Sequence, residues 1–306
     1  MIRILLSALA LCVIFAASVY GADSVDVDTK ISDVISNPAF NDFGRLIFPV
    51  NTSYYHGSTL GDLRLTWYSN IKPARTVEII KYMLEQTRHG RQIFYSMYPK
   101  DDPRAKNTGL FFFRGKAGNK FAVCSAGGGF AYVGAMHDSF PHALELSKRG
   151  YNAFALIYRP GADSACEDLA RAIAFIYENA EDLHVDVKNY SLWGGSAGAR
   201  MASWLGTYGT ESFGEKKYPR PSAAIMQYTG LSEITGSEPP TYSCVGTNDV
   251  IASYRTMRDR IDRIKSNGTN AEIEIFDGLA HGFGLGEGTA AEGWIDRAVN
   301  FWEAQK

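Results

Sequence analysis

A serine set among glycines is the first feature of this chain that could do chemistry. Residues 194–198 read Gly-Gly-Ser-Ala-Gly, directly after the apolar run 190–193 and directly before a stretch with helical character. Glycines let the backbone turn sharply from a strand into a helix, which exposes the serine hydroxyl at the tip of the turn. The pattern G-x-S-x-G also arises by chance, but in this setting it predicts that Ser196 is a nucleophile.

A nucleophilic serine needs a general base, which for a serine in a strand-turn-helix setting comes from a histidine further along the chain. The sequence has six histidines, and only His281 follows Ser196. It lies after the last expected strand, on a loop with glycine beside it, and is the predicted base. His137 and His142 flank the start of an expected helix; a structural role is favoured for both, with substrate lining as the alternative.

The histidine in turn needs a carboxylate that holds its tautomer and orientation. Asp249 follows the apolar run 241–245 in a short turn, where its side chain could reach the outer nitrogen of His281. Asp277, at the end of the run that leads into the histidine loop, is the competitor and is expected to close that turn. Asp249 is therefore the predicted acid.

A second glycine-rich loop, Ser-Ala-Gly-Gly-Gly-Phe at 125–130, follows the apolar run that ends at Cys124. Backbone N–H groups held at such a point stabilise the negative charge that develops on a carbonyl oxygen during acyl transfer. Gly127 and Gly128 are predicted to donate two N–H groups, and Ala197 a third. The alternative is a tight loop that needs glycine for steric reasons alone.

These residues must be positioned by an alternation of strands and helices. Helical periodicity between the later apolar runs indicates an α/β fold with a mostly parallel sheet covered on both faces. The first two runs have no helix between them and should be antiparallel. The expected strands are 92–98, 109–113, 121–124, 152–158, 190–193, 223–227, 241–245 and 271–276. The expected helices among them are 141–148, 165–179 and 251–266.

The N-terminal third is organised differently. Residues 1–21 carry Arg3, an apolar stretch and small residues near Gly21, which is typical of a cleaved secretory signal peptide. Residues 22–90 are an N-terminal extension rich in aromatic residues, which either cap the active site or anchor the extension to the domain at 91–306. Within the extension, 73–88 is expected to be a helix that ends near Gly90.

Composition excludes several classes of protein. A formal net charge of −2 and the short basic clusters argue against nucleic acid as a partner. No later segment is apolar enough to span a bilayer, so no stable membrane insertion is expected after signal cleavage. Cys124, Cys166 and Cys244 are too few for a disulfide framework or a zinc site; buried thiols are expected, with one bridge as the alternative. No metal or organic cofactor is implied, and the sequence does not report the oligomeric state.

With these residues assembled, the chain from about residue 92 to its end resembles the α/β-hydrolase superfamily of serine esterases. Within it, the likeness is to esterases related to hormone-sensitive lipase and to bacterial acetyl and feruloyl esterases. It includes Tyr158-Arg159, the segment Glu167-Asp168-Leu169 and the serine motif. One departure is Ala126, where that group usually has a histidine before the glycines. The resemblance implies an eight-stranded sheet, with Ser196, Asp249 and His281 as the catalytic triad.

The resulting hypothesis is a secreted or periplasmic serine carboxylesterase that acts through an acyl-enzyme. The expected substrate is a short-acyl or feruloyl ester, small or borne on plant polysaccharide. Two alternatives remain at this point: a serine peptidase of the prolyl oligopeptidase type, which uses the same triad, and a non-catalytic binding protein on a hydrolase scaffold.

Overall fold

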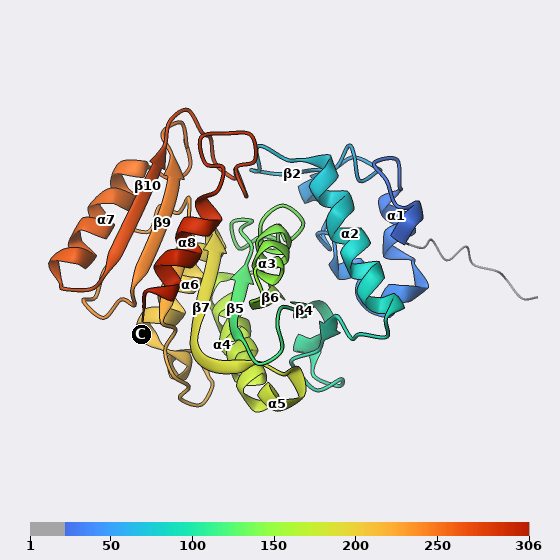
Figure 1. Ribbon diagram of the computed structural model, residues 1–306, viewed down its shortest axis with the longest axis horizontal. Coiled ribbons are helices and arrows are strands. Elements are labelled where there is room, and N and C mark those ends of the chain that lie inside the picture. Colours follow the sequence, from blue (N-terminus) through green and yellow to red (C-terminus); the bar gives the residue numbers. More distant parts are fainter. Residues whose placement is uncertain (1–21, 306) are drawn as a thin grey trace, which may run out of the picture.

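A computed structural model describes residues 22–305, so the expected signal peptide at 1–21 lies outside the described residues. An eight-stranded sheet runs through the middle of the molecule (Figure 1). Its strand order is β10-β9-β8-β7-β5-β6-β4-β3. The strands are β3 (Phe94–Tyr95), β4 (Gly109–Phe113), β5 (Lys120–Ser125), β6 (Asn152–Ile157), β7 (Asp186–Gly195), β8 (Ala223–Gln227), β9 (Thr241–Gly246) and β10 (Ala271–Phe276).

The sheet confirms the expected mostly parallel arrangement. From β6 to β10, each neighbouring pair of strands is parallel, whereas β4 is antiparallel to both β6 and β3. The expected first strand at 92–98 is shorter than predicted, because only Phe94–Tyr95 pair with β4. The chain leaves the sheet edge at Ser96, whose hydroxyl donates to the Tyr98 carbonyl at 2.9 Å.

Helices cover both faces of the sheet, as expected. On one face, α3 (Ser139–Lys148) and α8 (Trp294–Glu303) share a hydrophobic core with Phe111 and Phe113 of β4. On the other face, α4 (Ala162–Glu178) and α6 (Ala197–Tyr208) share a second hydrophobic core with Leu110 and Phe112. Adjacent residues of one strand therefore face opposite layers, which explains why β4 is apolar at every position. The short α5 (Ala180–Leu183) precedes β7, and α7 (Tyr254–Ser266) lies beside β9 and β10.

The N-terminal segment lies beside the β4 end of the sheet, where α1 (Ile31–Ile35) and α2 (Pro73–Arg88) appear in Figure 1. The helix expected at 73–88 has these bounds, and the next glycine, Gly90, has a φ of +70°. A small hairpin of β1 (Tyr55–His56) and β2 (Arg64–Leu65) lies between α1 and α2 in the chain. Ile79, Ile80 and Met83 of α2 belong to the same hydrophobic core as β4 and α3, so this segment is packed as part of the molecule.

The three cysteines of the described chain are free and buried. Burial raises the pKa of the Cys166 thiol to about 12 and raises the pKa values of Cys124 and Cys244 as well. Within residues 22–305, no helix combines the length and the apolar character that a bilayer-spanning helix needs.

Candidate active site

Ser196 occupies the sharp turn between β7 and α6. Its φ of +53° lies in the left-handed region, which residues with a side chain rarely adopt. The turn is held by the Ser196 N–H, which donates to the Gln227 carbonyl of the neighbouring strand β8 at 2.9 Å. A strained backbone that its surroundings hold in place is typical of a nucleophile turn.

The glycines of the serine motif allow close packing around this turn. A Cβ atom at Gly195 would lie 2.4 Å from Asp138 Oδ2, and one at Gly198 would lie 2.0 Å from the Ser125 carbonyl oxygen. Both distances are too short for any side chain. Glycine is therefore needed at these two positions for a second reason besides the turn: the strand, the helix and the glycine-rich loop pack too closely there for a side chain.

The structure brings together the three residues predicted to carry the chemistry. His281 Nε2 is 3.1 Å from Ser196 Oγ, and His281 Nδ1 is 2.7 Å from Asp249 Oδ2. Asp249 and His281 are buried, while Ser196 is partly exposed to the pocket. With Nδ1–H donated to Asp249, Nε2 of the neutral imidazole is free to accept the Ser196 proton.

Asp249 is fixed by the backbone that follows it. Its Oδ1 accepts the N–H groups of Ile251 and Ala252 at 2.8 and 2.7 Å. These bonds form a turn, and α7 consequently begins at Tyr254, later than the expected start at residue 251. Asp277, the competing acid, accepts the hydroxyl of Thr247 at 3.0 Å. Asp249 is therefore the acid that faces His281.

In the glycine-rich loop, the N–H group of one residue, Gly127, points to a different acceptor from the one predicted. Gly127 was expected to donate to the oxyanion, but its N–H donates to Asp138 Oδ2 at 2.7 Å, so this assignment is wrong. Within residues 22–305, no acceptor is found for the N–H groups of Gly128 and Ala197. Ala197 is the first residue of α6, whose first N–H groups lack partners within the helix. Gly128 and Ala197 remain the predicted oxyanion donors.

Asp138 is a site residue that the sequence analysis missed. Its fully buried carboxylate accepts the Gly127 N–H and the hydroxyls of Tyr68 and Tyr228, the latter two at 3.0 Å. Burial, with the Asp138 charge as the next cause, raises the pKa values of Tyr68 and Tyr228, so both tyrosines stay protonated donors. This carboxylate anchors the loop whose usual histidine is replaced by Ala126.

The site opens into a pocket of about 300 Å³. Its wall includes Ser196, His281, Gly128 and Gly129, together with Trp67 and Tyr68 of the N-terminal segment. Ser69 ties this segment to the histidine loop: its N–H donates to the Gly282 carbonyl at 3.0 Å and its hydroxyl to the His281 carbonyl at 2.7 Å. The segment at 22–90 thus both anchors its aromatic residues in the core and contributes to the catalytic pocket.

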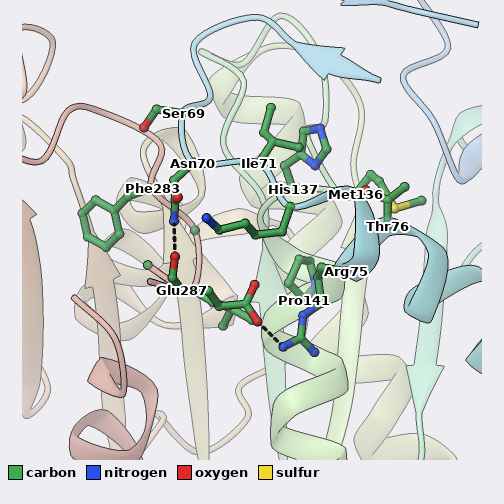
Figure 2. Close-up of a pocket in the computed structure, with 14 residues that line it drawn as sticks. Ser69, Asn70, Ile71, Arg75, Thr76, Met136, His137, Pro141, Phe283 and Glu287 are labelled. Carbon is green, nitrogen blue, oxygen red and sulfur yellow. Dashed lines mark hydrogen bonds and ion pairs between the residues drawn. The ribbon is translucent and has the colours of Figure 1, made fainter. Parts of the chain in front are cut away.

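A second, small pocket lies where the N-terminal segment meets the C-terminal loop (Figure 2). Arg75 points toward Glu287 there, and the Asn70 side-chain amide donates to the Glu287 carbonyl at 3.3 Å. His137 lines this pocket rather than the one at Ser196, and burial lowers its pKa to about 3. Burial also lowers the pKa of His142. Both rings are therefore neutral at neutral pH, in keeping with the favoured structural role.

Comparisons with known proteins agree with this geometry. The BD-FAE family model matches residues 114–253, which carry the glycine-rich loop, Ser196 and Asp249. No curated protein sequence matches the chain.

Solved structures with a similar fold include a propionate-bound esterase, Est2, from Thermogutta terrifontis, with 22% identity and a TM-score of 0.59 over 68% of this chain and 92% of that one. An acetyl ester-xyloside bifunctional hydrolase from Caldicellulosiruptor lactoaceticus has 20% identity and a TM-score of 0.61 over 69% and 95%. The α/β-hydrolase MGS-M1, from a Medee basin deep-sea metagenome library, has 18% identity and a TM-score of 0.57 over 69% and 95%.

The strand order and the nucleophile turn give this chain the α/β-hydrolase fold, which the similar esterase structures share. Its central part is similar to the BD-FAE family, which confirms the resemblance to serine esterases inferred from the sequence.

Proposed function

We propose that the protein is a secreted serine carboxylesterase that hydrolyses short-acyl or feruloyl esters of plant polysaccharide through an acyl-enzyme. The observation that carries the proposal is the continuous contact from Asp249 through His281 to Ser196, at 2.7 and 3.1 Å, beside two N–H groups without an acceptor in residues 22–305. Such an arrangement suits acyl transfer, in which a hydroxyl attacks a carbonyl carbon and an oxyanion develops.

In the first half of the reaction, Ser196 Oγ attacks the ester carbonyl while His281 Nε2 accepts the hydroxyl proton. Asp249 stabilises the imidazolium, and the N–H groups of Gly128 and Ala197 bind the oxyanion. The C–O bond to the alcohol then breaks, and the alcohol leaves with the proton from His281. In the second half, water loses a proton to His281 and attacks the acyl-enzyme; the C–O bond to Ser196 then breaks, Ser196 Oγ takes the proton back from His281, and the acid leaves.

The choice of substrate rests on three observations. The catalytic pocket has a modest volume of about 300 Å³, which suits a short acyl group better than a long fatty acid chain. The acetyl ester-xyloside hydrolase and the propionate-bound esterase share this fold. The expected signal peptide favours an extracellular or periplasmic substrate such as plant polysaccharide.

The proposal is tested with p-nitrophenyl acetate, butyrate, octanoate and palmitate, with methyl ferulate alongside. We expect turnover by residues 22–306 to be highest on acetate or ferulate. Ser196→Ala should lower kcat by roughly 10³- to 10⁶-fold, because the nucleophile and its base act as a unit. An unchanged circular dichroism spectrum controls for folding. Turnover that survives in Ser196→Ala, or that is highest on palmitate, would contradict the proposal.

Three further measurements separate the finer parts of the proposal. Release of acetate or ferulate from xylan should exceed release of fatty acid from a long-chain triglyceride. Cleavage of proline peptides without ester turnover would instead identify a peptidase. Secretion is checked by the mass of the protein that leaves the cell, which should correspond to a chain that begins near Ala22.

A further inference from the structure

Trp67 stands out among the five tryptophans of the sequence. Trp193, Trp294 and Trp302 are at most 2% exposed, whereas Trp67 is 47% exposed. Trp67 also forms part of the wall of the catalytic pocket, together with Ser196 and His281. A large apolar ring that remains open to solvent beside a nucleophile is available for contact with a substrate.

The backbone of Trp67 is held in an unusual conformation. Its φ of +70° lies in the left-handed region, which is a clear outlier for so bulky a residue. The residues on either side hold this conformation: the Thr66 N–H donates to the Tyr54 carbonyl at 3.0 Å, and the Tyr68 N–H donates to the Leu65 carbonyl at 3.3 Å. Strain of this kind persists only where the surroundings over-determine it, and it occurs preferentially at binding and catalytic sites.

Two tyrosines and the glycine-rich loop support the indole ring. Tyr54 and Tyr132 stack with their centroids 4.6 Å apart, and the indole lies 6.2 and 5.9 Å from them. The Tyr132 hydroxyl donates to the Thr66 carbonyl, which fixes the tyrosine pair to the chain that carries Trp67. A Cβ atom at Gly129 would lie 3.1 Å from Trp67 Cζ3, so the indole also packs against the loop. The ring is therefore a rigid surface at a fixed position relative to Ser196.

We propose that Trp67 is a stacking subsite for the apolar face of a six-membered ring of the substrate, and that it determines specificity. This inference rests on the proposed ester hydrolysis. Aromatic rings and the apolar faces of sugar rings share the chemistry that an indole recognises, because both offer a flat face of C–H or π character. The ring belongs either to an aromatic acyl group such as ferulate or to the sugar that carries an acetyl ester. The N-terminal segment thereby contributes to substrate recognition as well as to the core.

The kinetic test compares esters with and without a ring in two arms. Methyl ferulate is compared with methyl hexanoate for a ring in the acyl group, and acetylated xylobiose with ethyl acetate for a ring in the alcohol. Trp67→Ala should lower kcat/KM about fivefold for the ring-bearing ester of one arm, mainly through KM, in line with the strength of aromatic contacts. The ring-free esters should change less than twofold. Trp67→Phe keeps a ring and should retain most of the preference.

Tyr208→Ala is the matched control, because Tyr208 is an aromatic residue that is 46% exposed at the far end of α6. It should leave all four rates unchanged. If Trp67→Ala leaves both ring preferences intact, the inference is wrong. If it lowers all four rates equally, Trp67 has only a structural role and the inference is also wrong. Should Trp67→Ala fail to fold, Trp67→Gly removes the ring at a position whose positive φ suits glycine.

A binding measurement separates this inference from the proposed function. In the Ser196→Ala variant, methyl ferulate or xylobiose should protect the exposed Trp67 from quenching of its fluorescence by acrylamide, and the double variant with Trp67→Phe should lose that change. If the natural protein hydrolyses no ester but the protection is observed, the proposed function fails and the subsite stands. If esters are hydrolysed and neither ring compound gives protection, the subsite fails alone.

Discussion

Asp138 is one buried carboxylate that holds several parts of the candidate active site together. It holds the Gly127 N–H of the glycine-rich loop, Tyr68 of the N-terminal segment and Tyr228 after β8. Tyr228 lies edge-on to the catalytic His281, with the ring centroids 4.9 Å apart. The carboxylate therefore connects the oxyanion loop, the pocket wall and the surroundings of the base.

Asp138→Asn keeps the shape of the side chain but removes the charge and one acceptor oxygen. Three donors would then compete for one oxygen, and we expect the free energy of unfolding to fall by about 1–3 kcal/mol because a buried donor loses its partner. The loop should also shift, which lowers kcat roughly 10- to 100-fold with a smaller effect on KM. Urea unfolding and ester kinetics measure the two effects.

Asp262→Asn, at an exposed position on α7, is the control and should change neither quantity. An Asp138→Asn variant with normal stability and a normal kcat would show that the carboxylate is not needed to hold the loop.

The sequence predicted the three residues that lie together at this site but not the residue that supports them, for a physical reason. The order serine, acid, histidine left a single histidine after Ser196, so His281 could be assigned without a structure. The partners of Asp138, in contrast, lie 70 and 90 residues away in Tyr68 and Tyr228, and no local pattern connects them. Gly127 was assigned incorrectly for the same reason, because the orientation of its N–H is set by this distant network.

At the scale of elements, charged residues tie α2 to α3 and to the C-terminal loop. Arg75 of α2 is paired with Glu145 of α3 at 2.6 Å and with Glu287 of the loop that follows His281. Glu145 also binds Lys148 at 2.8 Å and Arg149 at 2.6 Å. Burial on its own would raise the pKa of Glu145, but Lys148, Arg149 and Arg75 outweigh it and lower the pKa to about 2.

Because this pKa is lower than that of an unfolded glutamate, the network stabilises the protein fully above about pH 4.5, and the contribution is lost as the pH falls toward 2. Glu145→Gln should therefore lower the free energy of unfolding at pH 7 by about 2 kcal/mol. The difference from the natural chain should shrink with acidification from pH 5 to pH 3, as followed by urea unfolding at each pH.

Glu85→Gln is the matched control on α2, since Glu85 pairs with Arg88 and His89 within one exposed turn. It should have little effect at pH 7. A Glu145→Gln variant as stable as the Glu85 control would mean that the network does not join the two helices.

The helices and strands themselves were largely predictable from the sequence. Their observed bounds differ from the expected ones where hydrogen bonds of particular residues determine where an element begins or ends. The expected strands from 109 onward correspond to β4 through β10, since buried parallel strands are apolar along their length. The start of α7 shifted to Tyr254 because Asp249 captures the N–H groups of Ile251 and Ala252. These hydrogen bonds arise from the position of Asp249 beside His281, and the spacing of apolar residues in the sequence does not indicate them.

At the scale of the whole molecule, residues 22–90 and the sheet share one hydrophobic core. Phe40, Ile79 and Ile80 are fully buried in a cluster that also contains Phe111 and Phe113 of β4. Anchoring of this segment by its aromatic residues was one of the two roles expected from the sequence, but the contacts themselves could not be predicted, because the aromatic residues follow no regular period. The place of residues 22–90 against the β4 side of the sheet is shown by the shared hydrophobic core.

A chain that begins at residue 91 should consequently fail to fold into an active enzyme. Removal of the segment uncovers the β4 side of the core, eliminates Trp67 and Tyr68 from the pocket, and breaks the bonds from Ser69 to the histidine loop. We expect aggregation or a large loss of cooperativity in thermal unfolding.

A chain that begins at Ala22 is the control and should unfold cooperatively with full ester turnover. If residues 91–306 alone were soluble and as active as this control, the segment would be dispensable for both the core and the pocket.

The position of the last helix has a consequence for biosynthesis. Trp294 and Trp302 of α8 pack on Trp193, three residues before the nucleophile, with ring centroids 6.1 and 6.4 Å away. Ser196 thus leaves the ribosome long before both its base and the helix that supports its strand. Since chains fold progressively from the N-terminus during synthesis, the nascent chain carries its serine without the means to activate it. The site can therefore reach its final arrangement only after His281 and α8 have been synthesised.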